Sequence, residues 1–308
     1  MSSAQLTRQA EMAASVIVGK SGNLFHRDHY AIDQLTGAAH FTPEEVEFWR
    51  NSVETRWAWC KANGIAFRMV IIPEKHVVLA HDLPDDVEIS EDRPAIQLMQ
   101  ALSPDVAKDC FYPLDLLRAQ YDYPTYYRTD THFTMYGGYL VYQQLMDSLK
   151  DVLDLTPVGV DDIELKPRPY TGDLGVRMEP EQEETVDFVS HKTFLPATRL
   201  FDNKRFTRGH TAVYQSERDQ APRCLLIRDS FSNYLVPHFI PVFSRTTAIG
   251  SISMHYDLVR HERPDVLIFQ IAERFLGNFD GEGLRIMPAD MGPTTFEEYS
   301  GVALDALP

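Results

Sequence analysis

Three residues of this chain have the types and spacing of a nucleophilic catalytic group: Asp130, His132 and Ser230. The stretch RTDTHFT, residues 128–134, places the aspartate two positions before the histidine, and the serine lies in LLIRDSFSNY, residues 225–234. A serine hydroxyl is a poor nucleophile at neutral pH, so it needs a nearby base and a third group that orients the base. Because residues i and i+2 of an extended segment point to the same side, we expect the carboxylate of Asp130 beside the imidazole of His132.

Ser230 stands where a buried apolar strand, CLLI, is followed by a predicted helix start. Ligands of open α/β sheets bind at such carboxyl ends of parallel strands. Free backbone amides at this place can stabilise an oxyanion, and the amide of Ser230 is itself a candidate donor. The spacing alone leaves a second interpretation open, in which Asp229 or Ser230 caps a helix and His132 is an ordinary surface histidine.

The elements that must position these residues alternate between helices and short apolar strands. The best-defined helix lies in FTPEEVEFWRNSVETRWAWCKANG, where Thr42 is a typical N-cap, Pro43 takes the first helical position and Gly64 ends the helix. The apolar strands are AFRMVIIP, CLLI, TTAIGS and LIFQIA. This alternation is typical of a parallel sheet covered on both faces, so the predicted fold class is α/β, a three-layer α/β/α sandwich.

We expect a single domain over residues 1–308, with residues 154–222 as an insertion or cap lying over the sheet edge. Prolines, glycines and charges interrupt that segment, as in PRPYTGDLGVRMEPEQEE, and short alternating pieces such as TVDFVS follow. The tail after Glu273 is irregular and rich in Gly, Pro and acids.

Composition limits the partners of the protein. The 29 basic and 45 acidic residues give a net charge of −16, which disfavours nucleic acid and membrane surfaces as partners. It would also repel a polyanionic glycan unless the binding groove is locally basic.

Cys60, Cys110 and Cys224 imply no disulfide framework, and Cys60 and Cys224 are expected to be buried thiols. The motif HRDH lacks further ligands at metal-binding spacing, so no metal site is expected.

The start of the sequence, MSSAQLTRQAEMAAS, lacks the basic segment and the apolar core of a secretion signal. No apolar run is long enough to span a bilayer. As given, the chain is expected to be cytoplasmic, or periplasmic if a leader was removed.

The RDSFS block resembles the Gly-Asp-Ser block of the SGNH hydrolase superfamily, and the rest of the chain resembles its alginate O-acetyltransferase branch, the AlgX and AlgJ group. In that branch the Asp-x-His motif precedes the serine block, as it does here. Further matching stretches are VIVGKSGNLF, VIIPEK, YRTDTHFTMYGGYLVYQQL, YTGDLG and RPDVLIFQIAERFL, so the resemblance spans residues 16–276. Two positions depart from the pattern, with Arg228 in place of the usual glycine and Phe133 in place of the usual tryptophan.

The resemblance implies that Ser230 is the acyl-accepting nucleophile, His132 the general base and acid, and Asp130 its orienter. It implies transfer of an acetyl group to a carbohydrate or polysaccharide precursor through an acyl-enzyme. The expected partners are a carbohydrate acceptor and other proteins of polysaccharide biosynthesis. No bound cofactor is expected, and acetyl-CoA is one candidate for the acetyl donor. Two alternatives stay open: a carbohydrate acetylesterase, and a non-catalytic glycan-binding or scaffold protein, which Arg228 favours.

Four further residues are candidates for oxyanion or substrate binding: Arg228, Asn233, Tyr127 and Glu273. Asn233 could donate to an oxyanion, and Glu273 ends the last apolar strand at the same edge as Ser230. Tyr127 stands close to His132 in the sequence and could stack on a sugar ring. Each also has a structural interpretation, as a turn residue, a strand end or a packing residue.

Overall fold

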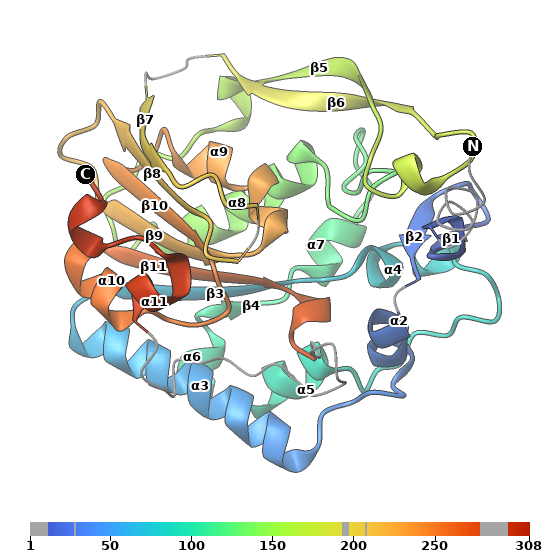
Figure 1. Cartoon of the computed structure of the whole chain (residues 1–308), viewed down its shortest axis with the longest axis horizontal. Coiled ribbons are helices and arrows are strands. Elements are labelled where there is room, and N and C mark those ends of the chain that lie inside the picture. The colour runs from blue at the N-terminus through green and yellow to red at the C-terminus, as the bar shows by residue number, and fades with distance from the viewer. Residues whose placement is uncertain (1–11, 28, 193–196, 207, 278–294) are drawn as a thin grey trace.

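The computed structural model describes residues 12–27, 29–192, 197–206, 208–277 and 295–308. Within these residues the chain builds one seven-stranded sheet with helices on both faces and two smaller two-stranded sheets (Figure 1). The strands of the large sheet are β3 (Ala66–Ile72), β4 (Cys110–Phe111), β7 (Ala197–Asp202), β8 (Thr211–Ser216), β9 (Arg223–Arg228), β10 (Arg245–Gly250) and β11 (Val266–Ala272).

The spatial order of the large sheet is β4, β3, β11, β9, β10, β8, β7. Its first five strands are mutually parallel, whereas β8 pairs antiparallel with β10 and β7 pairs antiparallel with β8. Strands β9, β10 and β11 are buried along almost their whole length, as expected for parallel strands covered on both faces. The predicted parallel sheet is therefore confirmed, with an antiparallel pair at one edge.

Each face of the sheet is covered by its own layer of helices. One face packs against α3 (Pro43–Ala62), α5 (Pro94–Ala101), α6 (Pro104–Ala107), α10 (Tyr256–Glu262) and α11 (Phe296–Ser300). The other packs against α4 (Lys75–Val78), α7 (Leu114–Arg118), α8 (Met135–Leu149) and α9 (Val236–Phe239). A further short helix, α2 (His29–Thr36), lies beside the turn after β11. The three-layer α/β/α sandwich is confirmed.

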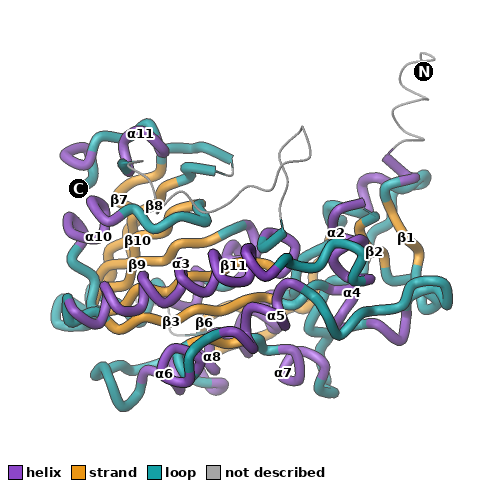
Figure 2. Tube along the Cα trace, turned by 90° about the horizontal axis from the view of Figure 1, so that it is seen from below, coloured by secondary structure: helices purple, strands orange, loops and turns teal. Residues whose placement is uncertain are grey.

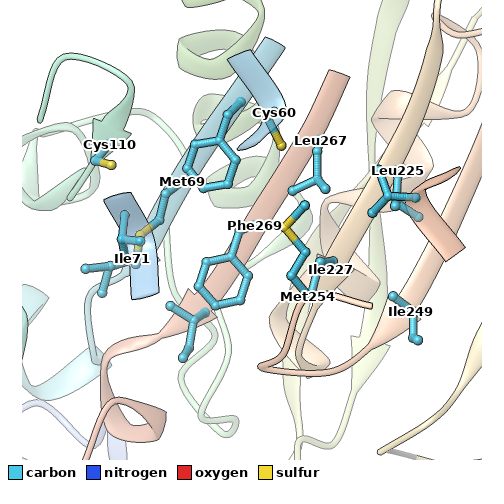
Figure 3. Close-up of a cluster of buried hydrophobic side chains, with 14 of the residues drawn as sticks. Cys60, Met69, Ile71, Cys110, Leu225, Ile227, Ile249, Met254, Leu267 and Phe269 are labelled. Atoms are coloured by element: carbon cyan, nitrogen blue, oxygen red, sulfur yellow. The ribbon is translucent and has the colours of Figure 1, made fainter. Parts of the chain in front are cut away.

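The first of these cores shows how the sequence pattern produces the layering. Thr42 caps α3 with a reciprocal bond to Glu45, as the capping-box pattern predicts. Figure 2, seen from below, shows α3 covering the strands and running roughly along them. In Figure 3 Cys60 of that helix points into a cluster of strand side chains that includes Met69 and Phe269. Burial raises the pKa of the Cys60 thiol to about 12, and Cys60 and Cys224 are buried free thiols as expected.

The segment 154–222 differs from the expected cap in one respect. Its first half forms a two-stranded antiparallel sheet of β5 (Ile163–Tyr170) and β6 (Glu184–His191), and β6 packs against α8. Its second half contributes β7 and β8, which extend the central sheet instead of covering it. Short alternating strands look alike whether they join the sheet or lie over it, because what decides is the partner strand, here β10. The bounds of an insertion, and the single domain over residues 1–308, stay predictions.

Candidate active site

His132 and Ser230 meet at the carboxyl edge of the parallel strands. Ser230 comes two residues after the end of β9, and the Nε2 atom of His132 lies 2.8 Å from its Oγ atom. The predicted helix start is instead a 3-10 turn, Ser230–Tyr234, followed by the short helix α9. Pro237 stands in the first turn of α9 and lacks the backbone N–H that a continuous helix from Ser230 would require at this position. The hydroxyl and the imidazole are within proton-transfer distance.

Asp130 lies on the other side of the imidazole. Its Oδ1 atom is 2.6 Å from Nδ1 of His132 and accepts a bond of 2.9 Å from the backbone N–H of the same histidine. The expected closeness is present, although residues 128–132 form a bent loop and not an extended strand. Tyr127 closes this loop by donating its backbone N–H to the carbonyl of His132 at 3.3 Å. Bending of the chain, and not strand periodicity, therefore brings the carboxylate to the ring.

Two residues of the site were missed by the sequence reasoning, Tyr170 and Asp173. The hydroxyl of Tyr170 donates to Oδ2 of Asp130 at 2.5 Å, and the backbone N–H of Asp173 donates to the same oxygen at 3.1 Å. The carboxylate of Asp173 accepts from the backbone and the hydroxyl of Thr131, at 2.8 and 2.7 Å. Gly172 lets the two loops meet, because a Cβ there would lie 2.4 Å from the carbonyl oxygen of Thr129. Both residues lie in the stretch YTGDLG, but the spacing of that stretch does not predict a role for either of them.

The electrostatics of the site favour an ionised Asp130. Burial by itself would raise the pKa of this carboxyl, but the hydrogen bonds from His132 and Tyr170 outweigh burial and hold the pKa below its ordinary value. Burial, together with the charge of Asp130, raises the pKa values of Tyr170 and Asp173. Tyr170 is therefore a protonated donor, and the imidazolium form of His132 would have an anion beside it.

Asp130, His132 and Asp173 also place ligand-type atoms within 4.8 Å of one another, close enough for a shared metal ion. The oxygens of both carboxylates already accept hydrogen bonds from groups of the protein, including the Thr131 hydroxyl and the Tyr170 hydroxyl. These three residues therefore fit a hydrogen-bond network in which the carboxylate oxygens already have donors.

Asp229 has a structural role next to the serine. Its carboxylate accepts from the backbone N–H groups of Phe231 and Ala272, at 2.9 and 2.5 Å, and from the side-chain amide of Gln270 at 2.9 Å. The side-chain oxygen of Gln270 in turn accepts from Ser232 at 2.6 Å. The interpretation of Asp229 as a cap is therefore correct. This network ties the end of β9 to β11 and so fixes the turn that begins with Ser230.

Arg228 and Asn233, on either side of Ser230 in the sequence, contact each other. The Nη1 atom of Arg228 donates to the side-chain oxygen of Asn233 at 3.2 Å, and Asn233 is exposed. Arg228 is only 7% exposed, and together with Ser230 it lines a pocket of about 290 Å³.

Glu273 and Tyr127 are buried and engaged within the protein, and their expected role in substrate binding stays a prediction. Glu273 is 1% exposed, and its carboxylate is paired with Arg93 at 2.8 Å and accepts from the hydroxyl of Tyr112 at 2.8 Å. Tyr127 is also 1% exposed, and its ring packs against that of Tyr170 with 4.5 Å between centroids. A strand end and an aromatic next to a motif are visible in sequence, whereas their burial depends on distant partners.

Comparison with known proteins gives a family match and several structural neighbours. The family model described as an SGNH hydrolase-like domain, acetyltransferase AlgX, matches residues 16–236. The structure of Bacillus cereus PatB1 superposes with a TM-score of 0.66 at 16% identity, covering 85% of this chain and 96% of PatB1. The O-acetyltransferase domain of Pseudomonas putida AlgJ gives 0.52 at 18% identity, covering 85% and 92%. Pseudomonas aeruginosa AlgX gives 0.54 at 15% identity, covering 83% of this chain and 61% of AlgX.

A search of curated proteins finds no match. At these low identities the structural neighbours show a shared fold, whereas the family model shows membership because it covers well over half of the chain. None of the described helices is both long and apolar enough to cross a membrane, and the expected compartment stays a prediction. The chain belongs to the AlgX family of SGNH hydrolase-like acetyltransferase domains.

Proposed function

We propose that this protein is a serine-dependent O-acetyltransferase in which Ser230 is the nucleophile, His132 the general base and acid, and Asp130 the residue that orients the imidazole. The observation that carries the proposal is the chain of contacts from Asp130 to His132 and from His132 to Ser230, of 2.6 and 2.8 Å. This is the arrangement by which a weakly nucleophilic hydroxyl is activated in serine enzymes.

In the first half-reaction His132 accepts the proton of the Ser230 hydroxyl through Nε2 while Oγ attacks the carbonyl carbon of the acetyl donor. The ionised Asp130 stabilises the imidazolium that forms. The backbone N–H of Ser230, which has no acceptor among the described residues, is a candidate donor to the oxyanion. Collapse of the tetrahedral intermediate passes the proton from His132 to the leaving group and leaves an acetyl ester on Oγ.

In the second half-reaction a sugar hydroxyl gives its proton to His132 and attacks the acetyl carbon, and Ser230 leaves as the regenerated hydroxyl. If water attacks instead, the same site is a carbohydrate acetylesterase, so the two activities differ in the exclusion of water and the binding of an acceptor. The acetyltransferase description of the family and the O-acetyltransferase domain of AlgJ favour transfer over hydrolysis. A carbohydrate is the proposed acceptor, and acetyl-CoA is one candidate donor.

Intact-protein mass spectrometry after exposure to 4-nitrophenyl acetate tests the acyl-enzyme. We expect hydrolysis and an adduct of about 42 Da, the mass that an acetyl group adds. Both should be lost in Ser230→Ala and strongly reduced in His132→Ala. Ser190→Ala, on β6, is the matched control and should behave like the unchanged protein.

An adduct that persists in Ser230→Ala, or equal hydrolysis by all variants, would overturn the assignment of the nucleophile. Complete absence of reaction in the unchanged protein would favour the non-catalytic alternative. Once the adduct is established, adding carbohydrate acceptors separates the two enzymatic alternatives. A transferase forms acetylated sugar at the expense of acetate, whereas an esterase releases acetate at an unchanged rate.

A further inference from the structure

The pocket beside Ser230 contains a buried guanidinium group. Its volume of about 290 Å³ lies at the lower end of small-molecule sites, which suits a group the size of one sugar ring. The lining that matters for the argument is Arg228, Asp229, Ser230, Ser251, Ile252 and Phe275. The pocket thus combines apolar walls with the nucleophile and with charged side chains, of which Arg228 is buried.

Arg228 has N–H groups without an acceptor among the described residues. A guanidinium carries five N–H groups, and Arg228 uses two on Nη1, for the carbonyl of Asp229 at 3.1 Å and for Asn233 at 3.2 Å, and one on Nη2, for Nδ1 of His210 at 2.5 Å. The Nε–H group and the second N–H of Nη2 have no acceptor among the described residues. Burial lowers the pKa of Arg228, and the neighbouring Asp229 opposes that shift. A buried cationic donor without an acceptor is costly. The Nε atom is fully buried, so the second N–H of Nη2 is the donor that an anion in the pocket would satisfy.

A second basic residue, Arg208, lines the pocket, although the protein as a whole is acidic. Of the four basic side chains between residues 199 and 208, Arg199 and Lys204 are paired with Asp202, which leaves Arg205 and Arg208. The total charge of the chain is −16. The pocket lining nevertheless carries two basic side chains and one acidic one, Asp229, which favours an anionic ligand.

Two acids lie close to the pocket, and both are already engaged. Asp229 accepts from two backbone N–H groups and an amide, as described above. Asp202 is paired with Lys204 at 2.9 Å and with Arg199 at 3.1 Å, and it contacts His210 at 3.2 Å. Because its charge is matched locally, Asp202 does not cancel the positive charge of Arg228.

We propose that this pocket is a subsite for an anionic group, a carboxylate or a phosphate, on the acceptor sugar, and that Arg228 is the residue that binds it. This inference rests on the proposed function. It concerns a feature particular to this chain, because the resembling family usually has glycine at the position of Arg228. The same pocket includes Ser230. A sugar anchored by its anionic group therefore has its neighbouring hydroxyls beside the acetyl ester.

Isothermal titration calorimetry on Ser230→Ala tests the subsite without depending on catalysis. The probes are glucuronate for the carboxylate, glucose 6-phosphate for the phosphate, and glucose as the neutral reference. We expect at least one anionic sugar to bind about 10-fold or more tightly than glucose, and the better of the two identifies the anion. Adding Arg228→Gln should remove that preference, because charge-assisted and bidentate bonds to the guanidinium are lost. Arg50→Gln, on α3, is the matched control, because its side chain is 39% exposed and the residue does not line the pocket.

Arg208→Gln is a second variant in case Arg228→Gln lowers the folded fraction, since Arg208 is exposed and lines the same pocket. It should weaken binding of the anionic sugar at low salt and leave the melting temperature unchanged. Equal binding of glucose and the anionic sugars, or a preference that survives Arg228→Gln in a folded protein, overturns the subsite. If the acetyl adduct on Ser230 still forms, the proposed function stands without it. Preferential anion binding with no adduct in the unchanged protein overturns the proposed function and leaves the binding subsite.

Discussion

Tyr170 holds the carboxylate of Asp130 from the side opposite His132. Its hydroxyl donates to Oδ2 at 2.5 Å, while Oδ1 lies 2.6 Å from the imidazole nitrogen. The same hydroxyl is 2.9 Å from that of Tyr234, which belongs to the turn that begins with Ser230. Tyr170 ends β5 and therefore comes from the segment predicted as an insertion. That segment is part of the site and restrains the rotation of the orienting carboxylate.

Tyr170→Phe should lower kcat for activated-ester hydrolysis by about 10-fold or more and leave KM close to its original value. The lost bond is to a charged group and contributes about 1.5–3 kcal/mol, and its loss lets the carboxylate rotate away from the ring. Initial rates over a range of ester concentrations measure both parameters. Tyr139→Phe is the control, because the Tyr139 hydroxyl contacts the carbonyl of Val158 at 3.3 Å, away from the site. Equal kcat in the Tyr170 variant and the unchanged protein would remove Tyr170 from the positioning role.

The sequence predicts the parts of this site that depend on local pattern. The cap of α3 at Thr42 follows from residue type, and Ser230 lies after β9 because an apolar run ends there. The contact of Tyr170 with Asp130 joins segments 40 residues apart, and no periodicity encodes such a pairing. The burial of Glu273 cannot be predicted from the local sequence either, because its partner Arg93 lies 180 residues away. Strand identity is local, whereas strand partners and the contents of a pocket are set by tertiary packing.

Glu273→Gln should lower stability and leave substrate binding unchanged. The carboxylate is buried, and its removal leaves the guanidinium of Arg93 without its anionic partner. Breaking a buried ion pair costs about 3–5 kcal/mol. The glutamine side chain keeps one acceptor oxygen, so we expect the loss in unfolding free energy to lie toward the lower end of this range. Denaturant unfolding measures the free energy of unfolding, and ester kinetics give KM. A raised KM at unchanged stability would indicate instead that Glu273 contacts substrate.

Asp229→Asn should reduce kcat through the position of Ser230. The aspartate accepts three bonds, from the backbone N–H groups of Phe231 and Ala272 and from Gln270. An asparagine keeps one acceptor oxygen and turns an NH₂ group toward one of these donors, so the turn after β9 must shift. We expect kcat to fall and the midpoint of denaturant unfolding to fall with it, since a buried donor left unsatisfied costs about 1–3 kcal/mol. Unchanged kcat in a destabilised variant would show that the network supports the fold and not the serine.

Lys75 should make the stability of the protein depend on pH near and above neutrality. Its ammonium group is buried and donates to the carbonyls of Leu24, Arg128 and Asp130, at 2.6, 2.8 and 3.2 Å. Burial lowers its pKa from 10.5 to about 7, although nearby carboxylates, that of Glu184 first, oppose the shift. Between these two pH values the unfolded chain holds a proton that the folded chain has released. The cost of burying the charge is therefore fully present below pH 7 and diminishes as pH rises from about 7 toward 10.5.

Lys75→Met removes this titration, so the difference in unfolding free energy between the unchanged protein and the variant should move in favour of the unchanged protein as pH rises. Urea unfolding of both proteins from about pH 6 to pH 9 measures the difference, whose slope is at most about 1.4 kcal/mol per pH unit. Lys166→Met is the control, because the Lys166 side chain is 52% exposed and paired with Glu164, and its difference should stay flat. A flat or falling difference for Lys75→Met would mean that the lysine stays charged throughout this range, held by its three carbonyl acceptors.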